Sequence, residues 1–446
     1  MNLPTMNRRS FLKTASLATA AATLPNLLRS QGAGEQSPNN KLNVVCCGVG
    51  GRGWDAVQGM KGENFVGFCD VDDERATKTY TEFPDVPRFK DFRVMFDKIG
   101  NKIDAVTVST PDHMHFPIAM AALALGKHVF VEKPLTHTVS EVRKLAETAR
   151  AKKVATQMGN QGHAGDGARR LKEWVEAGVL GDVRELHSWT NRPIWPQGVQ
   201  APDHSKMMPV VPATLDWDLW LGVAQSREYD PAYMPFTWRG YWDFGCGALG
   251  DMGCHVMDGA FWALSLTAPT AIIPVSANQT DVSAPTASAT RYEFPARGSM
   301  PALAWTWYDG GLMPTLPPEL EEGRRLPESG TLLIGSKATV VADTYYDSIR
   351  IIPEVKMKEA GPTLPGKTIP RVVGGHFAEW IRACKGGTPA GSNFDYSSKL
   401  TETVLLGNVA IRAKRRIEWD SAAMKVTNLA SANEFITGHY RPGFGV

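Results

Sequence analysis

The sequence predicts an α/β fold in which a doubly wound parallel sheet of the Rossmann type is followed by a second α/β domain. Three observations support this prediction. Apolar runs of strand length alternate with amphipathic stretches from residue 41 onward, and a glycine-rich turn follows the first run. The chain also has 446 residues, which exceeds one ordinary domain. We expect a leader over residues 1–33, a nucleotide-binding domain over 41–160 and a second domain over 161–446.

The composition is that of a globular protein. Apolar residues make up 43% of the chain, and its formal net charge is only +2. A balance so close to neutral gives no reason to expect a nucleic acid as a partner. No apolar run is long enough to cross a membrane, unless the leader is retained.

The leader has the features of a twin-arginine export signal. Arg8 and Arg9 precede Phe-Leu-Lys, and a mildly apolar, Ala/Thr-rich stretch follows over residues 14–24. We therefore expect the twin-arginine machinery as a partner and the periplasm as the location. No clear Ala-x-Ala cleavage site lies near residues 25–33, so an uncleaved signal that anchors the protein is a second reading.

A lysine at the end of a predicted strand is the first candidate for chemistry. The β-branched and aromatic run over residues 128–132 is typical of a buried strand in a parallel sheet. Pro134 cannot continue a central strand, so Lys133 is expected at the strand's carboxyl end, where open α/β sheets bind ligands. Its ammonium group can hold a polar substrate atom. A surface lysine at a strand edge would give the same local pattern.

A dinucleotide-binding pattern follows the first predicted strand, over residues 41–47. Glycines with this spacing let the backbone approach a pyrophosphate at the start of a helix. The next strand ends at Asp70, whose carboxylate can accept hydrogen bonds from a ribose 2′-hydroxyl and would repel a 2′-phosphate. NAD is therefore favoured over NADP. The residues of this turn are Gly48, Gly50, Gly51, Arg52 and Gly53.

The strand–helix alternation continues to residue 158. A strand over residues 105–109 ends at Thr110 and Pro111, and a helix is expected to begin at His115. The strand ends, Lys133 included, then meet at one crevice. His113 and His115 could bind a metal as a His-x-His pair, but no further ligand is evident nearby. We favour His115 as a loop or helix-start residue beside the cofactor and predict no metal site.

An aromatic-rich stretch over residues 215–244 precedes a glycine-rich turn. Nine of its thirty residues are aromatic, Trp238 among them, whereas the chain-wide fraction is 9%. Flat aromatic faces suit the apolar faces of sugar rings, and tryptophan keeps a polar N–H group. The alternative is that these side chains pin a long loop onto the sheet.

Asp251 and His255 form a second candidate pair, because two residues four apart share one face of a helix. A carboxylate beside an imidazole orients it and raises its basicity. The same spacing, with Asp258, could instead form a metal-binding face or a surface pair without a function.

Several of these motifs together resemble the Gfo/Idh/MocA oxidoreductases. They are Gly48-x-Gly50-x-x-Gly53, Thr110-Pro111-Asp112-x-x-His115, Glu132-Lys133-Pro134 and Asp251-x-Gly253-x-His255-x-x-Asp258. The resemblance implies a catalytic dyad of Asp251 and His255, and cofactor contacts from the first three motifs. It also implies a second domain whose large, mostly antiparallel sheet binds substrate and joins subunits into a homo-oligomer.

One departure from the family pattern follows the last strand of the first domain. Residues 159–163 replace an Arg/Phe-containing turn, and His163 is our candidate for a substrate contact there. In the second domain we expect strands over residues 183–190, 331–341 and 349–352, and helices over 166–177 and 397–412.

The predicted function is hydride transfer between a hydroxyl of a sugar or polyol and NAD. His255 would take the hydroxyl proton, Asp251 would orient His255, and Lys133 would bind the reacting oxygen. An exported enzyme needs a cofactor that stays bound and is restored in each cycle. The sequence leaves two alternatives open: a glycoside hydrolase that oxidises the sugar transiently, and a non-catalytic NAD-binding sensor.

Overall fold

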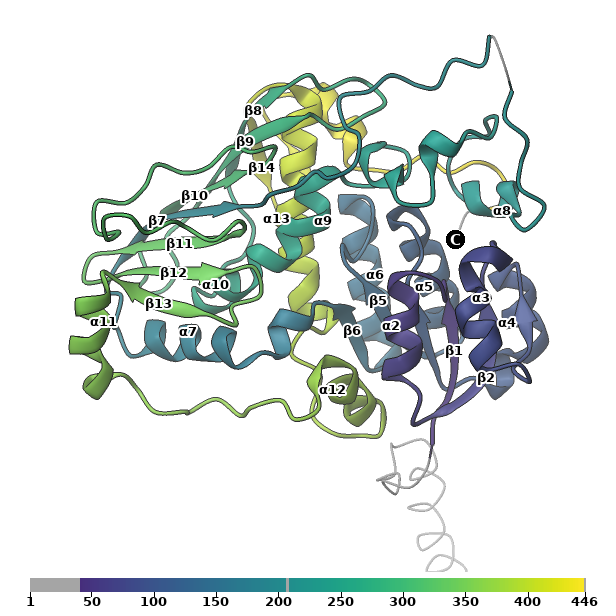
Figure 1. Cartoon of the computed structure of the whole chain (residues 1–446), viewed down its shortest axis with the longest axis horizontal. Coiled ribbons are helices and arrows are strands. Elements are labelled where there is room, and N and C mark those ends of the chain that lie inside the picture. The colour runs from purple at the N-terminus through teal and green to yellow at the C-terminus, as the bar shows by residue number, and fades with distance from the viewer. Residues whose placement is uncertain (1–40, 206–207, 445–446) are drawn as a thin grey trace, which may run out of the picture.

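The computed structural model describes residues 41–205 and 208–444. The leader, and with it the predicted export signal, lies outside the described residues. Two sheets lie side by side (Figure 1). The carboxyl ends of the first sheet's strands lie at the interface between them. No helix in the described part of the chain is long and apolar enough to cross a membrane.

The first sheet is parallel and confirms the predicted Rossmann-type fold. Its strand order is β3-β2-β1-β4-β5-β6. Strands β2 and β3 are added on one side of β1 and strands β4 to β6 on the other, so β1 and β4 form a topological switch point at which a crevice opens. Helices cover both of its faces. The strands are β1 (Asn43–Cys47), β2 (Asn64–Cys69), β3 (Arg88–Phe89), β4 (Ala105–Val108), β5 (His128–Glu132) and β6 (Thr156–Gly159), and the helices are α2 (Arg52–Gly59), α3 (Asp73–Glu82), α4 (Phe92–Ile99), α5 (His115–Ala124) and α6 (Val139–Lys152).

Local sequence signals explain where these helices begin. The Asp91 carboxylate accepts the backbone N–H of Arg93 and caps α4. Thr138 and Glu141 form a capping box at the start of α6. A short connection therefore follows Lys133 before α6 starts, which keeps the lysine at the rim of the sheet.

The second sheet has nine strands and is mostly antiparallel, as the resemblance implied. Its order is β13-β12-β11-β7-β10-β9-β8-β14-β15, and only β7 and β10 pair in parallel. The helices α7, α9, α10 and α13 pack against one face of it (Figure 1). The elements are α7 (Asp166–Glu176), β7 (Val183–Trp189), α9 (Gly247–Val256), α10 (Asp258–Ala263), β8 (Ala271–Ala277), β9 (Ala287–Phe294), β10 (Leu303–Tyr308), β11 (Gly330–Gly335), β12 (Thr339–Asp343), β13 (Ile349–Ile352), α13 (Phe394–Ala413), β14 (Ile417–Asp420) and β15 (Lys425–Val426).

One predicted strand was wrong. The expected strand over residues 331–341 is a hairpin, because β11 and β12 pair antiparallel around a turn at Ser336 and Lys337. Continuous apolar character hid the turn, since both strands are buried and only these two polar residues separate them.

The C-terminal part of the chain returns to the first domain. Helix α12 (Gly375–Cys384) places the buried Trp380 ring 5.7 Å from that of Phe130 in β5. Near the end of the chain, the Arg441 guanidinium donates to the carbonyl oxygen of Gly222 at 2.6 Å. Helix α12 therefore packs against the strand that precedes Lys133, and the end of the chain is fixed to the segment around Gly222.

The turn before β13 fixes the helices that carry the second half of the site. The Tyr346 hydroxyl donates to the carbonyl oxygen of Val256, at the end of α9. Helix α7 approaches this turn so closely that a Cβ atom at Gly167 would lie 1.5 Å from the Tyr346 carbonyl oxygen.

We expect Gly167→Ala to lower the free energy of unfolding by about 3 kcal/mol, because backbone rather than a flexible side chain blocks the added methyl group. Thermal and urea unfolding would measure the change. Gly62→Ala is the matched control, since a Cβ there would meet nothing within 4 Å. Equal stability of the two variants would contradict the packing described for α7.

Candidate active site

A cavity of about 520 Å³ opens at the carboxyl ends of β1, β2, β4 and β5 and extends to the segment over residues 234–239. It brings together most of the residues singled out from the sequence. Those that line it are Gly48, Gly50, Gly51, Arg52, Asp70, Thr110, Pro111, Glu132, Lys133, Trp238 and Asp251.

The glycine-rich turn has room for backbone only. Gly48 has a φ of +74°, and a Cβ atom there would lie 2.5 Å from the Ser109 carbonyl oxygen. A Cβ atom at Gly53 would lie 2.0 Å from the carbonyl oxygen of Gly48. Helix α2 begins at Arg52, directly after the turn, so its N-terminus faces the cavity. These features fit a dinucleotide pyrophosphate.

Asp70 lies at the end of β2 and links that strand to the turn. Its carboxylate accepts the backbone N–H groups of Val49 at 2.8 Å and Asp72 at 3.0 Å. Burial raises the pKa of Asp70, while these backbone donors oppose the shift. Because Asp70 lines the cavity, it can face a ribose hydroxyl as predicted.

Glu132 has a structural partner in the glycine-rich turn. Its buried carboxylate accepts a hydrogen bond from Arg52 Nε at 3.0 Å. A Cβ atom at Gly159 in β6 would lie 2.6 Å from Glu132 Oε2. The pair therefore ties the end of β5 to the start of α2 and orients the next residue, Lys133.

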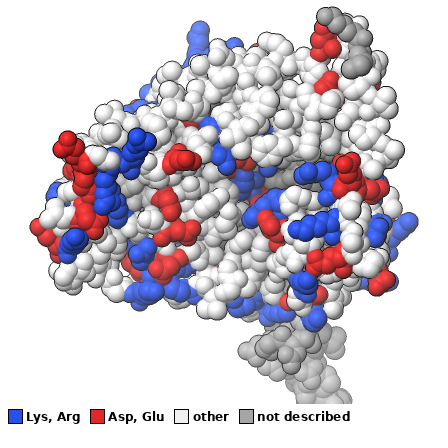
Figure 2. Space-filling model, in the orientation of Figure 1, with Lys and Arg blue, Asp and Glu red and all other residues white. Residues whose placement is uncertain are grey.

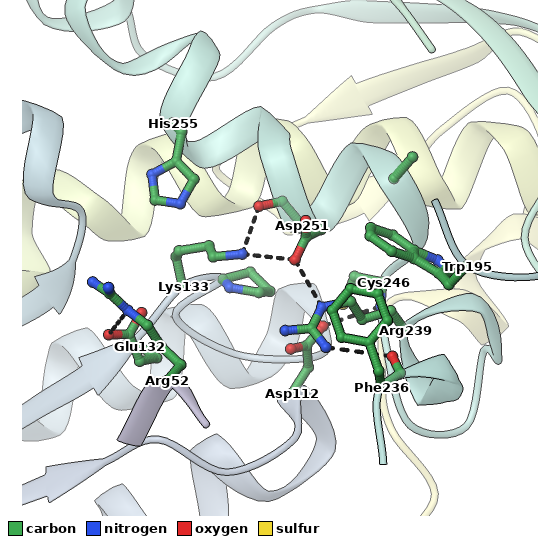
Figure 3. A network of polar contacts seen from close by, with 12 residues as sticks. Arg52, Asp112, Glu132, Lys133, Trp195, Phe236, Arg239, Cys246, Asp251 and His255 are labelled. Atoms are coloured by element: carbon green, nitrogen blue, oxygen red, sulfur yellow. Dashed lines mark hydrogen bonds and ion pairs between the residues drawn. The ribbon is translucent and has the colours of Figure 1, made fainter. Parts of the chain in front are cut away.

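Lys133 and Asp251 meet at the boundary between the two sheets (Figure 3). Lys133 Nζ donates to Asp251 Oδ1 at 2.8 Å and to the Asp251 carbonyl oxygen at 2.7 Å. Asp251 Oδ1 also accepts a hydrogen bond from Arg239 Nε at 3.1 Å. Burial by itself would raise the pKa of Asp251, but the two cations outweigh it and hold the pKa well below its usual range.

The expected contact between Asp251 and His255 is not the arrangement in the described structure. Both residues lie on α9, but the Asp251 carboxylate turns to the two cations, and His255 Nδ1 lies 2.7 Å from Asn160 Oδ1. Asn160 Nδ2 donates to the Cys254 carbonyl oxygen at 2.7 Å, which directs Oδ1 toward the ring. The Asp251 carboxylate contacts the two cations rather than the His255 imidazole because its electrostatic attraction to two charged donors is stronger than to a neutral ring.

The partner of His255 determines its tautomer. An amide oxygen only accepts, so Nδ1 carries the proton and Nε2 keeps the lone pair. Burial, with Lys133 as the next contribution, lowers the pKa of His255 well below its ordinary value of 6.5. The ring is therefore neutral near pH 7, and Figure 3 shows it beside the Lys133 side chain.

Two other histidines have structural partners. His115 is buried, with Nδ1 2.7 Å from the Pro134 carbonyl oxygen and Nε2 2.9 Å from that of Thr110. It holds the ends of β4 and β5 together. His115 is not one of the described residues that line the cavity. His163, expected to face the substrate, is 1% exposed, and its Nδ1 lies 2.9 Å from Asp258 Oδ1. The expectation failed because this turn folds beneath α10.

Asp112 and Arg239 also line the cavity, although no individual role was predicted for either of them. Asp112 closes β4, is 5% exposed, and accepts the backbone N–H of Cys246 at 3.1 Å. Burial raises its pKa to about 7, against the opposing effect of Lys133 and Arg239. Arg239 lies in a short 3₁₀ turn, directly after Trp238 and two residues before Tyr241, and no motif marked it.

Most of the aromatic stretch forms a cluster of its own. The Trp217 and Trp220 rings stack at 4.9 Å, and the Tyr233 ring lies 5.3 Å from that of Phe244. These contacts support the alternative that the aromatics pin the loop. Trp238 lines the cavity, but it is only 8% exposed and packs against Arg239.

No group of three or more metal-binding side chains occurs among residues 41–205 and 208–444. Asp251, His255 and Asp258, for which a metal-binding face was the alternative, each have a separate partner in the structure.

Comparison with known proteins gives three family matches along the chain. Residues 42–160 match an oxidoreductase family described as an NAD-binding Rossmann fold, and residues 166–294 match the C-terminal α/β domain of the same family, Gfo/Idh/MocA. Residues 5–25 match the twin-arginine translocation signal sequence, as predicted for the leader.

Individual relatives match part of the chain. The uncharacterized oxidoreductase YdgJ of Escherichia coli is 30% identical over 159 residues, which are 35% of this chain and 44% of that protein. A glycosyl hydrolase family 109 protein of Solibacter usitatus is 29% identical over 40% of this chain and 44% of its own length. The matches therefore span less than half of these relatives.

The same architecture occurs in solved structures. The WlbA dehydrogenase from Chromobacterium violaceum, solved with NADH and UDP-GlcNAcA, superposes with a TM-score of 0.59. The match covers 86% of this chain and 98% of that one at 14% identity, so it is a likeness of fold.

The raised pKa of Asp112 predicts a pH-dependent effect of Asp112→Asn. In the unfolded chain its pKa is the ordinary 3.8, and in the folded protein it is about 7. Between these values the folded protein binds the extra proton, so the wild type loses stability as the pH rises, whereas the variant does not. The variant should gain stability relative to the wild type from about pH 4 to about pH 7.

Urea unfolding of both proteins at several pH values would measure this difference, with Asp85→Asn as an exposed control. A stability difference that stays constant from pH 4 to pH 8 would contradict the burial described for Asp112.

Proposed function

Because the chain belongs to the Gfo/Idh/MocA oxidoreductase family and its first domain is an NAD-binding Rossmann fold, we propose that it transfers a hydride between NAD and a hydroxyl of a sugar or polyol. The observation that supports this most directly is the position of Lys133. Its ammonium group is held at the carboxyl end of β5, where the nucleotide cavity reaches the second domain.

The residues around this point supply the proton and charge steps. Bound NAD would supply the hydride acceptor for oxidation and the donor for reduction. Lys133 donates two N–H groups to Asp251, and its third can bind the reacting oxygen and stabilise negative charge on it. His255 Nε2, which holds a lone pair, would take the hydroxyl proton.

This arrangement gives Asp251 a different task from the one predicted. Its carboxylate holds Lys133 and Arg239 in place, while Asn160 orients His255. Lys133, Asp251 and His255 are therefore proposed as the catalytic residues, with Asn160 as a positioning residue. A non-catalytic sensor would have no need to retain this constellation.

Export limits how the cofactor of the proposed reaction can be regenerated. The leader matches a twin-arginine signal, and we place the mature protein in the periplasm. Free NAD is not expected to be replenished there, so the cofactor would enter in the cytoplasm and remain bound. Each cycle must then restore it, either by oxidising one sugar and reducing another or by oxidising and reducing the same sugar.

The second kind of cycle supports an alternative function. The relatives named as glycosyl hydrolase family 109 proteins favour a hydrolase in which transient oxidation of the sugar eases cleavage of a glycosidic bond. The same side chains would serve both reactions. Release of sugar from a glycoside without any added electron acceptor would support the hydrolase.

We also propose that the protein forms a homo-oligomer through its second sheet. Residues of β10 alternate between buried and half-buried, and Val275 in β8 is 69% exposed. A sheet covered by helices on one face only has a second face that can pair with another copy.

We expect Lys133→Met to lower turnover by at least about 100-fold while NAD stays bound, because the variant loses the donor to the reacting oxygen but keeps the glycine-rich turn. Steady-state kinetics and cofactor content would measure the two effects. Lys127→Met is the matched control at the opposite end of β5. Full turnover of Lys133→Met with bound NAD would contradict the proposed mechanism.

A captive cofactor predicts that protein purified from an exporting host contains NAD. Denaturation should release close to one nicotinamide per chain, and sugars should be converted without added cofactor. Protein that is empty after purification and binds NAD only when it is supplied would instead indicate an ordinary dehydrogenase.

A further inference from the structure

Arg239 presents unused hydrogen-bond donors at the substrate end of the cavity. Its Nε atom binds Asp251, and its Nη1 donates to the carbonyl oxygen of Phe236 at 3.3 Å. Nη2 has no protein acceptor among the residues that the structure describes. A guanidinium carries five N–H groups, so at least the two on Nη2 remain for a ligand.

Aromatic rings fix the plane of this guanidinium. Its Cζ atom lies 4.4 Å from the centre of the Trp238 ring and 4.5 Å from that of Phe236, with Trp195 at 5.8 Å. Contact with aromatic rings orients the fork and removes part of its hydration. Charge interactions made by the free edge are therefore less screened than at an open surface.

The charges around this edge do not cancel. Lys133 and Arg239 share a single carboxylate oxygen of Asp251. The other nearby carboxyl group, Asp112, lies next to the guanidinium in Figure 3 and is partly protonated near neutral pH, since its pKa is about 7. Glu132 is paired with Arg52, and Asp70 and Asp72 lie beside the glycine-rich turn at the nucleotide end of the cavity. The substrate end therefore has an excess of positive charge.

We propose that the substrate is an acidic carbohydrate, a sugar bearing a carboxylate, and that Arg239 binds this carboxylate while Lys133 binds the reacting hydroxyl. A planar carboxylate matches the guanidinium fork, and the two cations lie close together because both bind Asp251 Oδ1. A carboxylate a few bonds from the oxidised carbon can thus reach Arg239. The proposal rests on the proposed sugar oxidoreductase function and names its substrate class.

Matched sugar pairs test this proposal on the holoenzyme. Glucuronate with glucose, and galacturonate with galactose, differ in the carboxylate alone, and glucose 6-phosphate distinguishes a general anion site. We expect the wild type to prefer the acid by about 10- to 100-fold in kcat/KM, the discrimination typical of charged hydrogen bonds. Arg239→Gln should remove this preference, because it lowers kcat/KM for each acid by more than for the neutral sugar of the same pair.

The control is Arg227→Gln, the same substitution in the same aromatic cluster at a residue that stacks on Phe244 and does not line the cavity. It should retain the preference for acids. A wild type that prefers the neutral sugars, or an Arg239→Gln variant that loses activity equally on both members of a pair, would overturn the proposal. Preference for glucose 6-phosphate over both acids would overturn it as well.

Calorimetric binding separates failure of this proposal from failure of the proposed function. Selective binding of acids by the wild type, lost in Arg239→Gln, without any reduction of bound NAD would support the acid site and contradict the oxidoreductase reaction. Reduction of bound NAD by neutral sugars alone would support the reaction and contradict the acid site.

Discussion

The structure of the site depends on one buried carboxylate that is shared by two cations. Asp251 comes from α9, Lys133 from the end of β5, and Arg239 from the turn before α9. An ion pair of this kind is costly to bury, and leaving one member unpaired is costlier still. The three side chains therefore hold each other in place and lock the nucleotide-binding sheet against the second domain at the point where substrate and cofactor would meet.

This constraint divides the tasks of the surrounding residues. Because Asp251 is committed to the cations, His255 takes its orientation from Asn160, at the end of β6, and remains a neutral base. Glu132 and His115 do not touch the reacting groups but fix the backbone on either side of Lys133. The family motif of Glu132, Lys133 and Pro134 thus places the proposed catalytic lysine between two positions that hold it.

Much of the first domain could be predicted, because its signals are local. Strand-length apolar runs, the glycine spacing and the caps at Asp91 and Thr138 each depend on neighbours in the sequence. Asp251, His255 and Lys133 could be proposed as site residues for the same reason. Their partners could not, since the choice of Asp251 between an imidazole four residues away and a lysine 118 residues away is decided by packing. Arg239 lacks a motif, and Asp112 belongs to one that does not reveal its burial. His163 was misplaced because nothing local indicates that its turn is buried.

The central claim is that this cluster passes a hydride between a carbohydrate and a cofactor bound to the same chain. The most direct test is to mix the purified holoprotein with sugars deuterated at each carbinol carbon in turn, without added cofactor, and to examine the bound nicotinamide by mass spectrometry. The account predicts that deuterium from one carbon appears on the nicotinamide ring in the wild type and not in Lys133→Met. Product formation with no deuterium ever reaching the cofactor would contradict it.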